Sequence, residues 1–143
     1  TTGRGNVSTI KIRDKRFKLI DESYNSNPLS IKFSINRFSS MDTSKNKKIL
    51  LLGDMLELGK FSKKLHRGVS EIINNSKVDK VYVFGKKMRQ AFNKIKTQKK
   101  GRVLKSLKDV EDFINLEIKD KEYLMVKGSN STGLNKLIRK YTK

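Results

Sequence analysis

The sequence has no cysteine and a single histidine, His66, among its 143 residues. Without cysteine there is no disulfide, no thiolate nucleophile and no cysteine metal site, and one histidine cannot form a histidine-rich metal site. Long apolar runs are also missing, since the longest, residues 49–52, falls far short of the roughly 20 residues that span a bilayer. We therefore expect no disulfide, no metal site and no contact with a membrane.

Acidic residues are scarce as well. Asp and Glu number 14 against 34 Lys and Arg, which gives a formal charge of +20. Such a charge is one mark of a protein that binds nucleic acid through phosphate contacts. However, 26 of the basic residues are lysines spread along the whole chain, and Lys, Asn and Ile, all abundant here, share AT-rich codons. We interpret the charge as a solvated basic surface and keep a basic nucleic-acid-binding α/β domain as the alternative.

The length of 143 residues suits one domain but is short for an enzyme that binds a nucleotide and two further substrates. Residues 1–5 are polar and do not begin with Met, so the sequence shows no signal peptide. We expect residues 1–143 to form a single domain cut from a longer polypeptide.

The hydrophobic pattern alternates between strand and helix signals. Two short runs, 7–12 and 16–20, predict a hairpin-like pair of strands, and Asn27 and Pro28 predict the N-cap and first residue of a helix over 28–41. Four further strands, each followed by a helix, are expected at residues 47–52, 81–84, 102–104 and 123–126. Strands that are apolar on both faces are typical of buried parallel sheets. The predicted fold class is α/β, a Rossmann-like three-layer domain with a mostly parallel sheet, helices on both faces and an N-terminal hairpin-like pair.

Ligands of such sheets bind at the carboxyl ends of the strands. Three loops fall there, at residues 21–28, 53–59 and 127–133, and all three are polar or contain glycine. The usual nucleotide motifs are nevertheless missing. The second loop has five residues between its glycines where a P-loop has four, and no dinucleotide-binding glycine pattern follows a strand.

Loop 21–28 is the richest in candidate ligand-binding side chains. It combines two carboxylates that suit ribose hydroxyls, an aromatic face that suits a base, and two amides that both donate and accept: Asp21, Glu22, Tyr24, Asn25 and Asn27. The alternative interpretation is an ordinary loop that ends in the N-cap of a helix.

Loop 53–59 is unusual because it keeps three apolar residues, Met55, Leu56 and Leu58, between the acids Asp54 and Glu57. This pattern indicates that the segment either folds back onto its own domain or meets a partner domain. His66 lies beside the apolar stripe of the next helix, which is typical of a packing or capping histidine.

Lys127 and Ser129 follow the last buried strand, at the start of a helix. Backbone N–H groups and the helix dipole favour an anion at such a position. The alternative is simple helix capping by Ser129 or Ser131. Arg4, between two glycines, offers one guanidinium group that suits a phosphate.

Four segments in this order resemble one family. They are GRG at residues 3–5, IDESYNSNP at 20–28, LLGDMLELG at 51–59 with a following histidine, and VKGS at 126–129. Together they are similar to the C-terminal part of the bacterial UDP-N-acetylmuramoyl-tripeptide:D-alanyl-D-alanine ligases, the MurF family. GDMLELG is the most specific of these matches, and the resemblance covers nearly the whole chain.

The resemblance implies the third domain of a cytoplasmic bacterial enzyme of peptidoglycan precursor synthesis. In that family an N-terminal domain binds the UDP-sugar peptide, a central domain carries the P-loop and metal ligands, and the C-terminal domain closes over the site. The tripeptide carboxylate is activated as an acyl phosphate with ATP and Mg²⁺, and the amine of D-alanyl-D-alanine then attacks it. A missing P-loop and missing metal ligands are what this resemblance leads us to expect, as is an isolated domain without activity.

The resemblance also implies roles for individual residues. On the nucleotide side, it places a guanidinium near the ATP phosphates, a carboxylate on the ribose and three polar side chains along the cleft: Arg4, then Asp21 or Glu22, then Tyr24, Asn25 and Asn27. Near the dipeptide or the domain interface it places Asp54, Glu57 and His66. Lys127 and Ser129 are expected near the incoming substrate, although Asn130 stands where the family commonly has an arginine.

Overall fold

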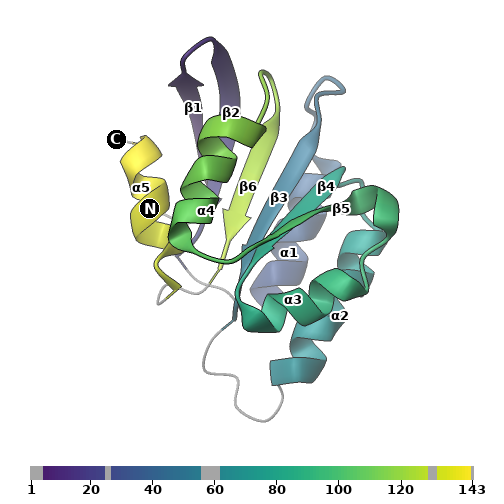
Figure 1. Ribbon diagram of the computed structural model, residues 1–143. Helices are drawn as coiled ribbons and strands as arrows, with labels where there is room; N and C mark the ends of the chain where they lie inside the picture. The colour runs from purple at the N-terminus through teal and green to yellow at the C-terminus, as the bar shows by residue number, and fades with distance from the viewer. Residues whose placement is uncertain (1–4, 25–26, 56–61, 129–131, 143) are drawn as a thin grey trace.

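The residues described by this computed structural model, 5–24, 27–55, 62–128 and 132–142, form a six-stranded sheet (Figure 1). The strands are β1 (Asn6–Ile12), β2 (Lys15–Glu22), β3 (Lys48–Gly53), β4 (Lys80–Phe84), β5 (Lys100–Leu104) and β6 (Tyr123–Lys127). Their order across the sheet is β1-β2-β6-β3-β4-β5. β1 pairs with β2 antiparallel, and the other neighbours pair in parallel. The predicted mostly parallel sheet with an N-terminal hairpin is confirmed.

Helices cover both faces of this sheet, also as predicted. On one face lie α1 (Pro28–Ser40), α2 (Ser62–Asn74) and α3 (Lys86–Asn93). On the other lie α4 (Leu107–Asp112), which continues as the π-helical η3 (Phe113–Glu117), and α5 (Leu134–Thr142). The connections from β2 to β3, β4 and β5 advance in one direction and the connection to β6 runs back, so right-handed crossovers place α4 opposite α1, α2 and α3. A single 3₁₀ turn, η2 (Thr97–Lys99), precedes β5.

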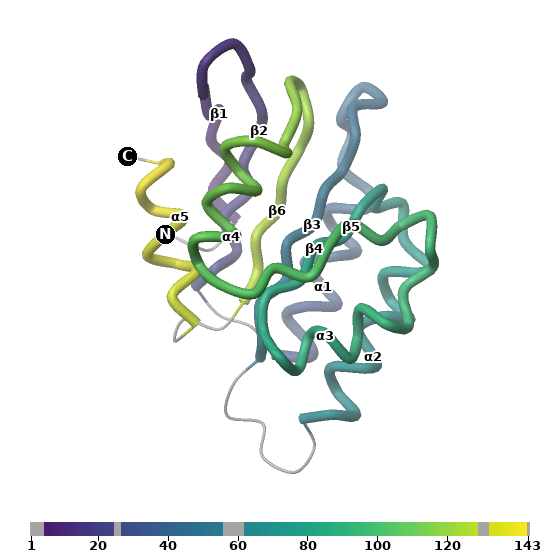
Figure 2. The backbone as a smooth tube through the Cα atoms, in the orientation of Figure 1, coloured from purple at the N-terminus to yellow at the C-terminus, as the bar shows by residue number. Residues whose placement is uncertain are grey.

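Two hydrophobic cores result, one under each helical layer. β3 serves both, because Leu50 and Leu52 face α1 and α2 while Ile49 and Leu51 face α4 and α5. All six of its residues are buried, which explains why the sequence of this strand is apolar on both faces. The backbone tube in Figure 2 shows the same three layers. None of the helices in the described residues has the length and apolar composition that a membrane crossing needs.

The predicted end of β2 is wrong. β2 was expected to end at residue 20, but it continues through Glu22 because β6 extends it, with Asp21 opposite Val126 and Glu22 opposite Lys127. The helix predicted to follow the strand at 102–104 is present, but it is not α-helical throughout. It becomes a π-helix after Asp112, and the ammonium of Lys15 caps its end by donating to the carbonyls of Ile114, Asn115 and Ile118 at 2.9, 2.9 and 2.6 Å.

Candidate functional site

The carboxyl ends of β2, β6 and β3 lie side by side, which confirms that the three polar loops follow neighbouring strand ends. Lys127 pairs in register with Glu22 on one side and with Leu52 on the other. Gly128, which follows the last residue of β6, lies close to β3. A Cβ on Gly128 would lie 3.1 Å from the Cα of Gly53, closer than ordinary van der Waals contact, so glycine favours this approach.

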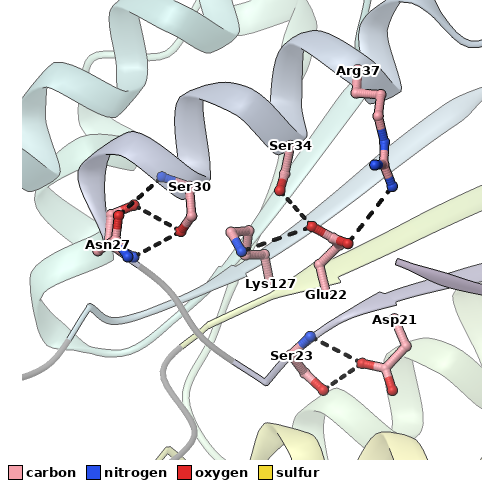
Figure 3. Close-up of polar contacts among 8 residues, drawn as sticks. All are labelled: Asp21, Glu22, Ser23, Asn27, Ser30, Ser34, Arg37 and Lys127. Atoms are coloured by element: carbon pink, nitrogen blue, oxygen red, sulfur yellow. Dashed lines mark hydrogen bonds and ion pairs between the residues drawn. The ribbon is translucent and has the colours of Figure 1, made fainter. Parts of the chain in front are cut away.

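Glu22 is the centre of the polar contacts at this edge (Figure 3). The Ser34 hydroxyl donates to its Oε2 at 2.5 Å, and Lys127 Nζ lies 3.9 Å from the same oxygen. On the other side, Arg37 Nη2 lies 3.9 Å from Oε1. One carboxylate from β2 therefore links α1 to the end of β6.

Lys127 is the buried cation of this group, with 4% of its side chain exposed. Burial lowers the pKa of its ammonium group, and the Glu22 carboxylate acts in the opposite direction. Opposite charges attract more strongly away from water, so the attraction to Glu22 helps to orient the Lys127 ammonium. This edge of the sheet can therefore offer a ligand one positively charged group, the Lys127 ammonium, at the end of β6.

Asp21 differs from Glu22 although the two are adjacent. Strand alternation sends their side chains to opposite faces of the sheet, as Figure 3 shows. Asp21 is buried, and its Oδ1 accepts hydrogen bonds from the backbone N–H of Ser23 at 3.0 Å and from the Ser23 hydroxyl at 2.5 Å. Asp21 thus fixes the chain as it leaves β2.

Asn27 is the N-cap of α1, as predicted. Its Oδ1 accepts from the backbone N–H of Ser30 at 3.0 Å, and the Ser30 hydroxyl accepts from the backbone N–H of Asn27 at 3.1 Å. This reciprocal pair is a capping box, and it fixes the direction in which the helix leaves the loop. Tyr24, at the end of the described part of this loop, is 38% exposed.

Asp54 contacts α3. Its carboxylate accepts from the backbone N–H of Met88 at 2.8 Å and of Lys87 at 3.4 Å, and so it caps a helix that begins after Gly85. Gly85 has φ +120°, and a Cβ there would lie 2.4 Å from the Asp54 carboxyl carbon. The glycine therefore makes room for a cap that comes from the residue directly after β3.

Replacing Asp54 with alanine should lower the free energy of unfolding by about 1 kcal/mol, as for other helix caps. The reason is the loss of the acceptor for two N–H groups of α3. Urea denaturation of the two proteins measures this change. The exposed Asp14 supplies the control, because Asp14→Ala should leave the midpoint almost unchanged. Equal effects of the two substitutions would contradict the capping role.

His66 holds the chain that follows β3. It is fully buried, and its Nε2 accepts from the backbone N–H of Met55 at 3.0 Å. Nδ1 lies 2.7 Å from the carbonyl oxygen of Ser62, so Nδ1 carries the proton. Burial lowers the pKa of this imidazole, in agreement with a neutral ring. The contacts are those of a packing histidine, and the buried Met55 has folded back onto its own domain.

Other candidates lie outside the described residues: Arg4, Asn25, Glu57 and Ser129. Conversely, the sequence analysis missed Ser34 and Arg37, which bind Glu22 from α1. Their spacing of three residues puts them on one side of the helix, and that signal was available. Within the described ranges, no three or more His, Asp or Glu residues are grouped so that they could hold a metal ion.

A cavity of about 740 Å³ lies at the opposite, amino edge of the sheet, lined among others by Lys47, Lys80 and Glu122. Its volume suits a small ligand. However, ligands of parallel sheets bind at the carboxyl edge, and Glu22, Ser34 and the buried Lys127 come together there from three different elements. We therefore place the candidate site at the Glu22–Lys127 edge.

The strand order and the helices on both faces define a doubly wound α/β domain. A family model described as "Mur ligase, glutamate ligase domain" matches residues 7–130. That match covers most of the sequence, and the chain belongs to this family. The nucleic-acid-binding alternative is not favoured by these findings.

Curated relatives carry a more specific name. The UDP-N-acetylmuramoyl-tripeptide–D-alanyl-D-alanine ligase of Bacillus subtilis is 37% identical over 73 residues, which are 51% of this chain and 16% of the relative. The ligase of the same name from Buchnera aphidicola is 33% identical over 122 residues, or 84% of this chain and 26% of the relative. The chain thus spans about a quarter or less of the length of these two relatives.

Solved structures confirm the fold. A MurF ligase from Thermotoga maritima in complex with ADP superposes with a TM-score of 0.74 at 24% identity, covering 99% of this chain and 31% of the ligase. A MurF from Acinetobacter baumannii gives a TM-score of 0.77 at 21% identity, covering 99% and 31%.

Proposed function

We propose that this chain is the C-terminal domain of a three-domain ligase that joins D-alanyl-D-alanine to UDP-N-acetylmuramoyl-tripeptide. The relation to the Buchnera ligase across 84% of the chain carries the proposal. The position of the charged Glu22–Lys127 group at the carboxyl edge supports it, since this is the edge where such folds meet ligands. The enzyme would act in peptidoglycan precursor synthesis in the bacterial cytoplasm.

In the proposed reaction, ATP phosphorylates the tripeptide carboxylate, and ADP leaves. The amine of D-alanyl-D-alanine then attacks the acyl phosphate, forming the peptide bond and releasing inorganic phosphate. Catalysis of such a transfer depends mainly on positioning and on neutralising charge. We assign the Mg²⁺ that accompanies ATP to the central domain, because the described part of this chain has no group of ligands for it.

Within this proposal, the residues of the chain fall into two groups. Those on the nucleotide side are Arg4 at the phosphates, Asp21 or Glu22 at the ribose, and Tyr24, Asn25 and Asn27 along the cleft. Those on the dipeptide side are Lys127 and Ser129, with Glu57 in the loop whose start is held by Asp54 and His66. Lys127 supplies a positive charge whose position is set by Glu22 and by the end of β6.

The partners of this domain are then the N-terminal and central domains of the same polypeptide. A domain that supplies a few side chains on closure completes a site that the other domains begin. This division of roles agrees with the sequence, which has no P-loop, and with the charged Glu22–Lys127 pair at the ends of β2 and β6.

The full-length protein should release inorganic phosphate when ATP, Mg²⁺, UDP-N-acetylmuramoyl-tripeptide and D-alanyl-D-alanine are supplied together. The 143-residue chain should release none under the same conditions, because it has no P-loop. A phosphate-release assay measures both. Full-length protein without this activity would contradict the proposed function, and release by the 143-residue chain would contradict the assignment of ATP binding to the other domains.

A further inference from the structure

Helix α1 carries an apolar surface that the domain itself does not cover. Leu29 is 78% exposed and Phe33 is 63% exposed, and their spacing of four residues puts them on the same side of the helix. The guanidinium carbon of Arg37, one turn further on, lies 5.8 Å from the centre of the Phe33 ring. We call Leu29, Phe33 and Arg37 the α1 stripe.

Among the described residues, the contacts that hold α1 on the domain do not involve Leu29 or Phe33. Glu22, the last residue of β2, contacts α1 at Ser34 and Arg37. With a rise of about 1.5 Å per residue, Leu29 lies roughly 7.5 Å before Ser34 along the helix axis. The inner side of the helix is fully buried at Ile31 and Ile35, so folding of this domain does not require Leu29 or Phe33 to be apolar.

The stripe is connected to the candidate site by consecutive contacts. Phe33 lies against Arg37, Arg37 lies 3.9 Å from Glu22, and Glu22 lies 3.9 Å from the buried Lys127. A partner that covers Phe33 removes water from Arg37 and strengthens the electrostatic interactions of its guanidinium group. Docking on this surface would therefore change the electrostatic environment of Lys127 at the end of β6.

We propose that the α1 stripe is the docking surface for a domain that precedes this chain in the same polypeptide, an inference that rests on the proposed function. The length of the relatives supports that occupant, because this chain covers 26% of the Buchnera ligase and 31% of the Thermotoga ligase. Adjacent exposed apolar residues beside a candidate site are typical of a protein–protein contact.

The path of the chain supports the same occupant. The backbone N–H of Gly5 donates to the carbonyl of Asp21 at 2.7 Å, and a Cβ on Gly5 would lie 2.7 Å from Arg37 Nη2. Gly5, the first described residue, thus lies beside Arg37 of the stripe. Because the exposed Lys32 and Arg37 flank the apolar residues, the matching face is apolar with carboxylates at its border.

Thiol labelling in the full-length protein tests this proposal. Phe33→Cys and Leu116→Cys form a matched pair, because Phe33 and Leu116 are 63% and 66% exposed in this domain, and Leu116 lies in η3 on the opposite face of the sheet. Maleimide modification of each introduced thiol is followed by peptide mass spectrometry. We expect the cysteine at position 33 to react about tenfold more slowly than the one at 116, since a docked surface excludes the reagent. Equal rates at the two positions would overturn the proposal.

Ligase activity supplies the second measurement. The double variant Leu29→Ser/Phe33→Ser should lose about tenfold in kcat/KM or more, whereas Leu116→Ser should retain the wild-type value. Unchanged thermal unfolding of both variants verifies that they are folded. Wild-type activity in the double variant would overturn the docking role. A wild-type protein without activity would instead contradict the proposed function, and the labelling rates would still decide between a docked and an open stripe.

Discussion

Replacing Glu22 with alanine should lower the free energy of unfolding by about 2 kcal/mol, the cost of leaving a buried donor without its acceptor. Lys127 has 4% of its side chain exposed and would lose its carboxylate neighbour, and the Ser34 hydroxyl would lose its acceptor. Chemical denaturation of the 143-residue chain, followed by circular dichroism, measures the change.

Two further variants serve as controls for this prediction. Adding Lys127→Met to Glu22→Ala should restore part of the lost stability, because an apolar side chain in that buried position needs no counter-charge. The pair of Arg102 and Glu117 is the exposed counterpart, with 47% and 35% of the side chains accessible. Glu117→Ala should therefore change the stability by less than about 1 kcal/mol. If Glu22→Ala were as mild as Glu117→Ala, the strand-end pair would have no structural importance.

Acidification should destabilise the domain through His66. The pKa of this buried imidazole lies below its ordinary value of 6.5, chiefly because burial disfavours the charged form. Below about pH 6.5 the unfolded chain therefore binds a proton that the folded chain does not. The free energy of unfolding decreases as the pH is lowered through that window. Once the folded imidazole is protonated, Nε2 can no longer accept from the Met55 N–H, a loss of roughly 1–3 kcal/mol.

The matched variant for this effect is His66→Gln, whose amide oxygen can accept the same hydrogen bond but does not titrate. Urea denaturation at a series of pH values from neutral to acidic gives the slope for each protein. The slope between pH 6.5 and 5 should be smaller in His66→Gln than in the wild type. Identical slopes would show that other groups cause the acid sensitivity.

The elements of the fold were predictable because the signals for them are local. Apolar spacing located the helices, and the capping box at Asn27 follows from residues only three positions apart. The apolar run 49–52 indicated a strand buried on both faces, and β3 is the centre of both cores.

Contacts between residues of different elements were harder to predict from the sequence. Asp21 and Glu22 look like the start of a polar loop, and only pairing with β6 makes them strand residues. Asp54 precedes Met88 by more than thirty positions, so no local pattern identifies it as a cap of α3. Likewise, the apolar Met55 in a loop left two possibilities, and packing of the whole domain decided for the core.

The strand order also determines when the sheet can form. β6 lies between β2 and β3, so residues 123–127 join two ladders that are otherwise separate. During synthesis from the N-terminus, the β1–β2 hairpin and the β3–β4–β5 ladder emerge first, each with one edge that awaits β6. Such long-range parallel pairing is slow, and open apolar strand edges favour association between chains. The nascent domain is therefore most vulnerable to aggregation just before its last strand leaves the ribosome.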